Sequence, residues 1–348
     1  MENLAVIKIF FLTTIAFVVA ITWTPLLAHF LYKYKLGKQI RDGASAPIMS
    51  KLHQGKAGTP TMGGLLVWVT TLALAVAFFY LSQLLHWQIF NDLNFLSRSQ
   101  TLLPLGALVA SAIVGLIDDI LNVRKIGPRG GGLRMRHRIL IYTLIAIVGA
   151  IWFFYKLDWH VLHIPFVGNY DIGFWYIPIF IFIIVATAFS VNEIDGLDGL
   201  AGGTLLAAFA AFGAIAFSQG KYDLAAFCGV IIGALLAFLW FNINPARFFM
   251  GDTGAMSLGV TLGIVAMLTN SVLLLPIIGF LFVLESLSVI IQVLSKKFRG
   301  RKIFLSAPFH HHLEAIGWPE PKIVMRFWII AGVTAVIGLI VSLLDKVW

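Results

Sequence analysis

Several aspartates stand where long apolar runs of the chain end, and their spacing suits metal binding or proton transfer. They are Asp118 and Asp119 in "IVGLIDDILN", Asp195 and Asp198 in "NEIDGLDGLAGG", and Asp252 in "MGDTG". An acid at bilayer depth costs about 2.5–3.5 kcal/mol on insertion scales. The aspartates therefore mark either the aqueous edge of a membrane segment or a place where a cation or a substrate binds.

The chemistry of this set predicts a magnesium site. Carboxylate oxygens are hard ligands that favour Mg²⁺ or Mn²⁺ over zinc, and the chain has one cysteine. Mg²⁺ takes one or two protein carboxylates and completes its shell with water and phosphate oxygens. The aspartates exceed this need, so the surplus leaves candidates for a general base. A simpler interpretation is that the pair in "DGLDG" caps a helix and the pair in "DDILN" forms a solvated helix end.

A further segment, "GKAGTPTMGG" (55–64), carries groups that bind phosphate. It supplies the ammonium of Lys56, the hydroxyl of Thr61 and several backbone amides. It is not a Walker motif, because no G-x-x-x-x-G-K-[ST] occurs in the chain. We expect this segment to form a turn that leads into a membrane helix. Its polar groups suit a phosphorylated ligand.

Three consecutive histidines, His310, His311 and His312, stand in "SAPFHHHLE". Consecutive residues cannot all project to one side of a helix, so one site that uses all three is disfavoured. A zinc site with Glu314 is disfavoured too, because the spacing matches no usual ligand pattern. We expect hydrogen bonding or charge stabilisation beside an anionic substrate.

The composition indicates a polytopic membrane protein. Of 348 residues, 59% are hydrophobic and 12% are charged, which is about half the charged share of a soluble protein. The net charge of +9 is explained by the Lys and Arg excess that orients membrane segments, shared with anionic lipids or a phosphorylated substrate. No nucleic-acid partner is expected. The single cysteine, Cys228, excludes an internal disulfide framework.

Ten apolar stretches are long enough to cross a bilayer, which takes about 20 residues each. They centre on residues 6–31, 62–86, 101–121, 138–156, 174–191, 200–218, 222–241, 254–270, 272–294 and 324–344. Only "TNS" separates the eighth from the ninth, and Pro276 is the residue expected to bend the ninth. We therefore expect an all-α fold of about ten transmembrane helices, forming a single integral membrane domain over residues 1–348.

The basic residues divide unevenly between the two sides of these stretches. Of the 25 Lys and Arg, 20 fall in the connections near 32–58, 122–138, 192–199, 242–253 and 295–326. The other connections, with the C-terminal tail, hold 4. Because Lys and Arg concentrate in cytoplasmic loops, we expect both termini outside. The polar segments described above then share the cytoplasmic face, which predicts an active site built from cytoplasmic loops.

These segments resemble the ordered signature motifs of a known family. "KAGTPTMGG", "DDILN", "NEIDGLDGLAGG", "NINPARFFMGDTG" and "SAPFHHHLE" are similar to those of bacterial phospho-N-acetylmuramoyl-pentapeptide transferases, within the polyprenyl-phosphate N-acetylhexosamine-1-phosphate transferase superfamily. The resemblance covers essentially the whole chain. It implies that undecaprenyl phosphate and UDP-N-acetylmuramoyl-pentapeptide give lipid I and UMP, with Mg²⁺, at the bacterial cytoplasmic membrane during peptidoglycan biosynthesis.

The resemblance also implies roles for individual residues. Those implied to be catalytic are Asp118, Asp119, Asp252 and His311, of which the three aspartates are also the implied metal ligands. Those implied to bind substrate are Lys56, Thr61, Asn192, Asp195, Asp198, Asn242, Phe249, His310 and His312. Phe249 is suited to stack on uracil.

Two positions depart from the family pattern. Family members usually have "NLTDGLDG", whereas this chain has "NEIDGLDG" with an extra acid at Glu193. Arg138, in "GLRMRHR", stands where a lysine is common. Arginine keeps the charge of lysine but not its geometry.

The expected mechanism places Asp118 at the attacking lipid phosphate, as the group that accepts its proton or orients it. Asp252 would hold the metal, and Lys56 and the histidines would offset phosphate charge. Direct attack and a two-step route through an aspartyl phosphate both fit these residues. A sister transferase that uses another UDP-N-acetylhexosamine and a membrane transporter are the alternative functions. Membrane lipids, a homodimer and later-step cell-wall enzymes are the partners considered.

Overall fold

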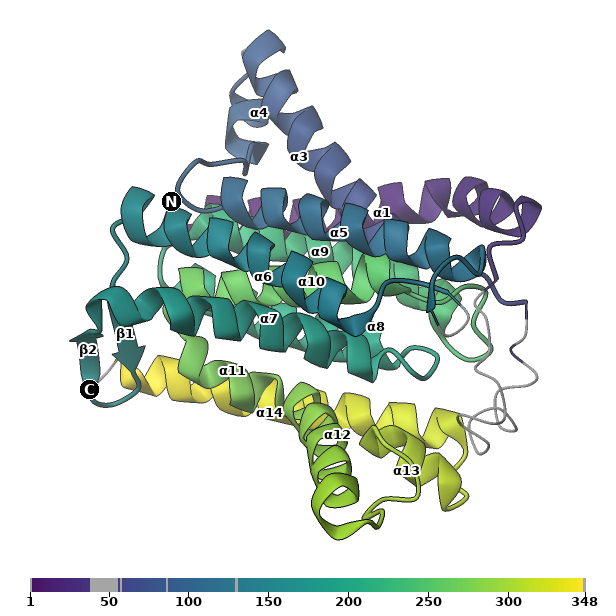
Figure 1. Ribbon diagram of the computed structural model, residues 1–348. Coiled ribbons are helices and arrows are strands. Elements are labelled where there is room, and N and C mark those ends of the chain that lie inside the picture. The colour runs from purple at the N-terminus through teal and green to yellow at the C-terminus, as the bar shows by residue number, and fades with distance from the viewer. Residues whose placement is uncertain (1, 38–55, 57, 86, 129–130, 347–348) are drawn as a thin grey trace.

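The computed structural model describes residues 2–37, 56, 58–85, 87–128 and 131–346, and most of its long helices run side by side in one bundle (Figure 1). The long helices are α1 (Glu2–Lys33), α3 (Leu65–Leu85), α5 (Leu102–Val123), α6 (Met135–Ile151), α7 (Tyr176–Ile194), α8 (Leu200–Ser218), α9 (Tyr222–Asn242), α10 (Asp252–Leu268), α12 (Phe280–Arg299) and α14 (Glu320–Asp345). The short elements are α4 (Gln88–Leu93), η3 (Trp152–Lys156), β1 (Val161–Ile164), β2 (Gly168–Asp171), η4 (Gly173–Trp175), η5 (Val272–Leu274), α11 (Leu275–Ile278) and α13 (Phe309–Ala315).

The apolar composition makes the long helices membrane spans. Within the described residues, 8 helices have the length and hydropathy to cross a bilayer, and 9 do if a bent pair near residue 279 is one span. Inside a bilayer the backbone polar groups must be bonded within the segment, and a helix achieves this. The expected all-α, multi-pass membrane fold is therefore confirmed.

The centre of the bundle is formed by α9 and α10. The most apolar window of α9 is 78% buried by protein, whereas that of α1 is 22% buried and faces lipid. Every residue from Thr253 to Leu268 of α10 is buried, and α10 packs against α5 and α7. The helix that begins at Asp252 is thus surrounded by protein, which fixes the position of its first turn.

The eighth and ninth predicted spans differ from ordinary membrane helices. The eighth is α10, whose 17 residues fall below the length of a full span; because neighbouring helices enclose it, it need not match the bilayer thickness. The ninth is broken, since Val272–Ile278 and Phe280–Arg299 meet at an angle of 81°. The break lies at Gly279, beyond Pro276 where the bend was expected.

Beyond this break, α12 leaves the bundle (Figure 1). Its polar buried side includes Glu285, Ser288 and Gln292, spaced three and four residues apart, and its other side exposes apolar residues such as Ile290 and Val293. This spacing is that of an amphipathic helix with one stripe on protein and one stripe on lipid. The polar stripe of α12 is therefore available to support the site.

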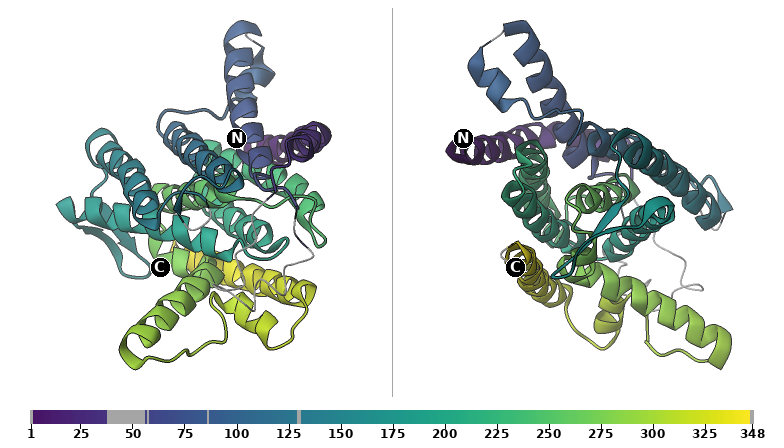
Figure 2. Two further views of the ribbon diagram at one scale, coloured as in Figure 1. Left: turned by 45° about the vertical axis from the view of Figure 1, so that its right-hand side comes forward. Right: turned by 90° about the vertical axis from the view of Figure 1, so that its left-hand side faces the viewer.

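Both ends of the described chain lie at one end of the bundle, and the C-terminal end lies beside the antiparallel hairpin of β1 and β2 (Figures 1 and 2). The opposite end gathers the C-terminal ends of α5, α7 and α9 and the N-terminal end of α14 (Figure 1). The polar segments named from the sequence therefore meet at one end, as expected. That this end faces the cytoplasm stays a prediction.

One close helix contact gives a direct test of the fold. A Cβ added at Gly64 would lie 2.2 Å from the Cα of Gly254, whereas a Cβ at Gly106 of α5 would meet nothing within 4 Å. We expect Gly64→Ala to destabilise the protein by about 1–3 kcal/mol, because only backbone movement relieves the overlap. Thermal unfolding in detergent measures the difference. Gly106→Ala is the control with an unchanged or slightly raised melting temperature, and equal stability of the two variants would contradict the packing.

Candidate active site

The last turns of α5 carry the first acid of the site. Asp118 is 3% exposed. Its Oδ1 accepts the backbone N–H of Leu133 at 2.6 Å, and its Oδ2 lies 2.5 Å from Nε of Arg138. Leu133 belongs to the connection after α5, and Arg138 to the first turn of α6. This connection thus folds back over the acid and fixes the direction of its carboxylate.

Arg138 joins this acid to Asp252. Its Nη2 lies 3.0 Å from Oδ2 of Asp252, and Oδ1 of Asp252 accepts a hydrogen bond from the side-chain amide of Asn192 at 2.8 Å. Gly251, just before α10, has a φ of +73°, a conformation that favours glycine. Four helices, α5, α6, α7 and α10, therefore bring two acids, an amide and a guanidinium to one point.

The second acid of α5, Asp119, faces the first turn of α10. Its Oδ2 accepts the N–H of Thr253 at 3.0 Å, and its Oδ1 lies 3.5 Å from the hydroxyl oxygen of Thr61. The first N–H groups of a helix have no partner within the helix, so this carboxylate supplies one. The two helices can come this close because Gly115 has no side chain. A Cβ at that position would lie 2.4 Å from the carbonyl oxygen of Asp252.

Backbone hydrogen bonds fix "TPTMGG" against the loop before α10. The N–H of Gly63 donates to the carbonyl of Phe249 at 2.7 Å, and the N–H of Phe249 donates to the carbonyl of Pro60 at 2.8 Å. This exchange holds Thr61, whose hydroxyl reaches toward Asp119. The segment predicted to bind phosphate therefore lies beside the acids.

Lys56 lies between two carboxylates. Its Nζ is 2.6 Å from Oδ1 of Asp198 and 2.6 Å from Oε1 of Glu320. The same ammonium lies 5.8 Å from the centre of the Phe249 ring. The second oxygen of Asp198 accepts the side-chain amide of Asn244 at 3.0 Å. The network ties the loop after α7 and the loop after α9 to the start of α14.

Asn242, the last residue of α9, and Asp195 were both predicted to bind substrate. Oδ1 of Asn242 accepts the N–H of Gly199 at 2.9 Å, and its Nδ2 donates to the carbonyl of Phe248 at 2.8 Å. Asp195 directly follows α7, where its N–H donates to the carbonyl of Asn192 at 3.3 Å. In this structure Asn242 braces one loop against the other.

The three histidines separate into a pair and a single residue. The rings of His310 and His311 have centroids 4.0 Å apart. Both lie against Gly196, where an added Cβ would be 2.2 Å and 3.1 Å from their Nε2 atoms. His312 lies apart, and its Nδ1 accepts the N–H of Leu305 at 3.3 Å. Two of the histidines therefore reach the "DGLDG" loop, and the third holds its own loop.

Two acids that sequence reasoning did not assign support this arrangement. Glu285 of α12 lies 3.2 Å from Nδ1 of His310, with both side chains fully buried, and it also accepts the N–H of His310. Glu320 bonds to Lys56 and to the N–H of Asp198 at 2.6 Å. The sequence could have indicated a role for Glu285, because it is a single acid within the apolar run "FLFVLESLSVII". No feature of "GWPEPK" sets Glu320 apart in this way.

The Glu285–His310 contact is expected to contribute measurably to stability. Glu285→Ala leaves the buried N–H of His310 without its acceptor and removes the carboxylate 3.2 Å from its ring, which costs about 1–3 kcal/mol. Thermal unfolding of the purified protein in detergent measures this cost. Glu2→Ala, which removes an exposed acid, is the matched control. Identical unfolding of the two variants would show that the contact does not stabilise the fold.

Comparison with known proteins places the chain in a family. The model of glycosyl transferase family 4 matches residues 101–270, and the phospho-N-acetylmuramoyl-pentapeptide-transferase signature 1 matches residues 56–66. A phospho-N-acetylmuramoyl-pentapeptide-transferase of Chloroflexus aggregans is 39% identical, over 96% of this chain and 89% of that protein. The chain belongs to the phospho-N-acetylmuramoyl-pentapeptide-transferase family. Proteins of that name from Geobacillus sp. and Anoxybacillus flavithermus are 38% and 37% identical, over 94% and 96% of this chain and 96% and 98% of those proteins.

The matched regions coincide with the acid cluster of this family member. Residues 101–270 contain Asp118, Arg138, Asn192 and Asp252, and residues 56–66 contain Lys56 and Thr61. The histidines, Glu285 and Glu320 lie outside both matched regions. Glu320 bonds to Lys56 and to the N–H of Asp198 inside them, and His310 and His311 lie against Gly196. The whole-length similarity to the named relatives includes these outer segments too.

The carboxylates of this transferase-family chain suit a magnesium ion. Asp118 and Asp252 both place an oxygen on the Arg138 guanidinium, so a cation is already accommodated between them. Among the described residues, no three His, Cys, Asp or Glu side chains form a metal-binding group. Two carboxylates with water and phosphate oxygens meet the needs of Mg²⁺. The oxygens of Asp118 and Asp252 thus suit a divalent cation, and Oδ2 of Asp119 accepts the N–H of Thr253; magnesium binding by these three acids stays a prediction.

Proposed function

We propose that this chain transfers phospho-N-acetylmuramoyl-pentapeptide from its UDP-linked donor to undecaprenyl phosphate, giving lipid I and UMP. Membership of the family supports this reaction. The observation that carries it is the cluster of Asp118, Arg138 and Asp252 at the end of the helix bundle. Such a position gives a polar site access to an aqueous nucleotide and to the head of a membrane lipid.

The reaction exchanges one phosphorus–oxygen bond for another. An oxygen of the lipid phosphate bonds to the β-phosphorus of the donor, and the bond from that phosphorus to the bridging oxygen breaks, so UMP leaves with the electron pair. Asp118 is held by Leu133 and Arg138 in one direction, which suits it to orient the attacking phosphate or accept its proton. Transfer of this kind depends mainly on positioning and charge neutralisation.

Charge neutralisation is assigned to three groups. Mg²⁺, held by Asp118 and Asp252, would withdraw charge from the diphosphate when bound. Arg138 contributes a fixed positive charge between the same acids. Lys56 stands 5.8 Å from the Phe249 ring, so a cation for phosphate and an aromatic face for uracil lie side by side.

We place this site on the cytoplasmic face of the bacterial inner membrane. The support is the division of Lys and Arg in the sequence, 20 of 25 in the same set of connections as the polar motifs, which is typical of cytoplasmic loops. UDP-linked donors are water-soluble, so the site must open to the compartment that contains them. Protease protection of a tagged N-terminus in oriented vesicles tests this orientation.

Release of UMP by the purified protein tests the donor. The protein in detergent, with undecaprenyl phosphate and MgCl₂, is expected to release UMP from UDP-N-acetylmuramoyl-pentapeptide and to leave UDP-N-acetylglucosamine unused. The reverse preference would identify a sister transferase of the same superfamily. Failure with both donors, in protein that unfolds cooperatively, would contradict a transferase function.

A further inference from the structure

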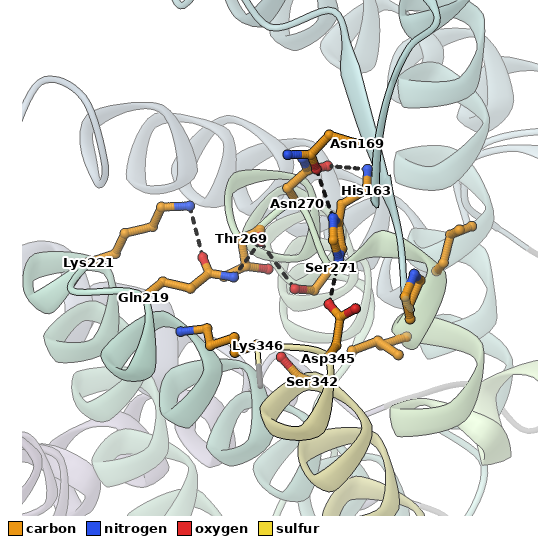
Figure 3. A pocket seen from close by; sticks show the side chains of 13 residues that line it. His163, Asn169, Gln219, Lys221, Thr269, Asn270, Ser271, Ser342, Asp345 and Lys346 are labelled. Carbon is orange, nitrogen blue, oxygen red and sulfur yellow. Dashed lines mark hydrogen bonds and ion pairs between the residues drawn. The ribbon is translucent and has the colours of Figure 1, made fainter. Parts of the chain in front are cut away.

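A polar pocket lies at the end of the bundle opposite the acid cluster. It has a volume of about 500 Å³, within the range of small-ligand sites. Four segments form its walls: the β1–β2 hairpin, the turn between α8 and α9, the turn between α10 and η5, and the end of α14 (Figure 3). Neither the proposed reaction nor the family comparison assigns it a role.

One side of this pocket is cationic. Lys221 and Lys346 line it together with Gln219 (Figure 3). The ammonium of Lys221 donates to the side chain of Gln219 at 2.9 Å and to the carbonyl of Leu268 at 2.7 Å. That of Lys346 donates to the carbonyl and hydroxyl oxygens of Ser218. Each ammonium has three protons, so each keeps one beyond these two neutral acceptors, and the ammonium of Lys221 also lies 5.3 Å from the centre of the Trp159 ring.

The charge of this side is incompletely balanced. Burial, with the nearby charge of Lys346 second, lowers the pKa of Lys221 from 10.5 to about 8. Burial also lowers the pKa of Lys346 below its usual value. In the part of the chain that the structure describes, the hydrogen bonds of both ammonium groups end on uncharged oxygens. An anion between the two lysines would relieve this repulsion.

On the other side of the pocket, a carboxylate already has its hydrogen-bond partners. Asp345 is the acid among the lining residues. Its Oδ2 lies 2.5 Å from Nε2 of His163, and its Oδ1 accepts the N–H of Phe166 at 2.6 Å. Nδ1 of His163 lies 2.7 Å from the side-chain oxygen of Asn169. The acid is thus engaged away from the lysines and leaves their charge available.

We propose that this pocket binds a phosphate group between Lys221 and Lys346. Lys221 and Lys346 line one cavity and lie close enough for the charge of one to lower the pKa of the other, and ammonium groups with a donor to spare can form charge-assisted hydrogen bonds to phosphate oxygens. The pocket lies near the hairpin and the start of α7, where Phe174 and Trp175 are 66% and 73% exposed. Exposed aromatic side chains at a helix end are typical of the membrane interface, where lipid phosphates lie, so a lipid headgroup and free phosphate share the required chemistry.

Titration of purified, delipidated protein tests the site, with inorganic phosphate in one arm and dihexanoyl phosphatidylglycerol in the other. Wild-type protein is expected to bind, and Lys221→Gln to weaken binding about tenfold or more, as loss of a charged hydrogen bond does. Tighter binding of the lipid assigns the source as a headgroup, and equal binding assigns it as free phosphate. Absence of binding in both arms, or equal binding by wild type and Lys221→Gln, would overturn the proposal.

Two further variants separate the site from general effects. Lys156→Gln removes an exposed positive charge at the end of η3, at the same end of the bundle, and should bind like wild type. Lys221→Arg retains the charge and should retain most of the binding even if Lys221→Gln unfolds. UMP release should persist in each folded variant, so this test is independent of the proposed reaction.

The pH dependence of binding gives a second readout. Because burial and the charge of Lys346 lower the pKa of Lys221 to about 8, its ammonium loses its proton as pH rises through that range, and phosphate binding to wild type should weaken with it. The groups that face Lys221 are Lys346 on the same side and the His163–Asp345 pair across the pocket. A bound phosphate should raise the pKa of Lys221, measured by NMR of ¹³C-methylated lysines. An unchanged Lys221 signal on adding phosphate would contradict binding at this position.

Discussion

Asp252→Asn is expected to abolish UMP release while the protein stays folded. The amide keeps the size of the side chain and an oxygen that can accept the Asn192 hydrogen bond, but it loses the charge that faces Arg138. Metal-assisted charge stabilisation contributes several kcal/mol, and each 1.4 kcal/mol is about tenfold in rate. We therefore expect a loss of about 10³-fold or more in kcat, measured as UMP released per minute.

Asp223→Asn is the matched control for this result. Asp223 forms an ion pair with Lys8 at 2.8 Å, in the first turn of α9 and remote from the acid cluster. The same change of charge there should leave kcat within about twofold of wild type, since surface and half-buried ion pairs contribute little to a distant site. Near-normal turnover by Asp252→Asn, or equal losses in the two variants, would remove Asp252 from the mechanism.

Asp118→Asn is expected to lower kcat by about 10²–10⁴-fold, the contribution of a positioned general base. The carboxylate is held by the Leu133 N–H and by Arg138, and it is also a proposed ligand of the metal at the donor diphosphate. KM for the UDP-linked donor should therefore rise by less than kcat falls. Steady-state kinetics at varied donor concentration separates kcat from KM.

The adjacent acid provides the comparison. Asp119 accepts the Thr253 N–H, and an asparagine oxygen can accept the same hydrogen bond, so Asp119→Asn should cost less activity than Asp118→Asn. Thermal unfolding establishes that both variants are folded. A larger loss for Asp119→Asn would reverse the roles of the two acids and assign the proton to Asp119.

The sequence predicted the helices well where hydrophobicity alone decides. The apolar stretches at 200–218 and 222–241 match α8 and α9 nearly residue for residue, because their ends are set by polar or glycine residues. Hydrophobicity does not indicate the direction in which a helix runs. The bend was therefore expected at Pro276, whereas the structure has an 81° break at Gly279. The path of α12 depends on contacts with α7, which is distant in sequence, and with α13, the next helix along the chain.

The sequence indicated which residues belong to the site, but it did not indicate which of them contact one another. Asp118 and Asp252 stood out as acids at the ends of apolar runs, and they meet as expected. Arg138 was known as a variant position, yet its bridge between the two acids depends on how the connection after α5 folds back. Glu320 was missed because an acid at the start of a helix is common, and its partner Lys56 lies 264 residues away in the chain.

The central claim is that this chain moves phospho-N-acetylmuramoyl-pentapeptide to a lipid phosphate at the Asp118–Arg138–Asp252 cluster. The most direct measurement is the yield of UMP and of lipid-linked product from purified protein, with and without Mg²⁺. Equal amounts of the two products, both lost on adding EDTA and in Asp252→Asn, are the predicted result. UMP without lipid-linked product, or the same yield from Asp252→Asn, would contradict the claim.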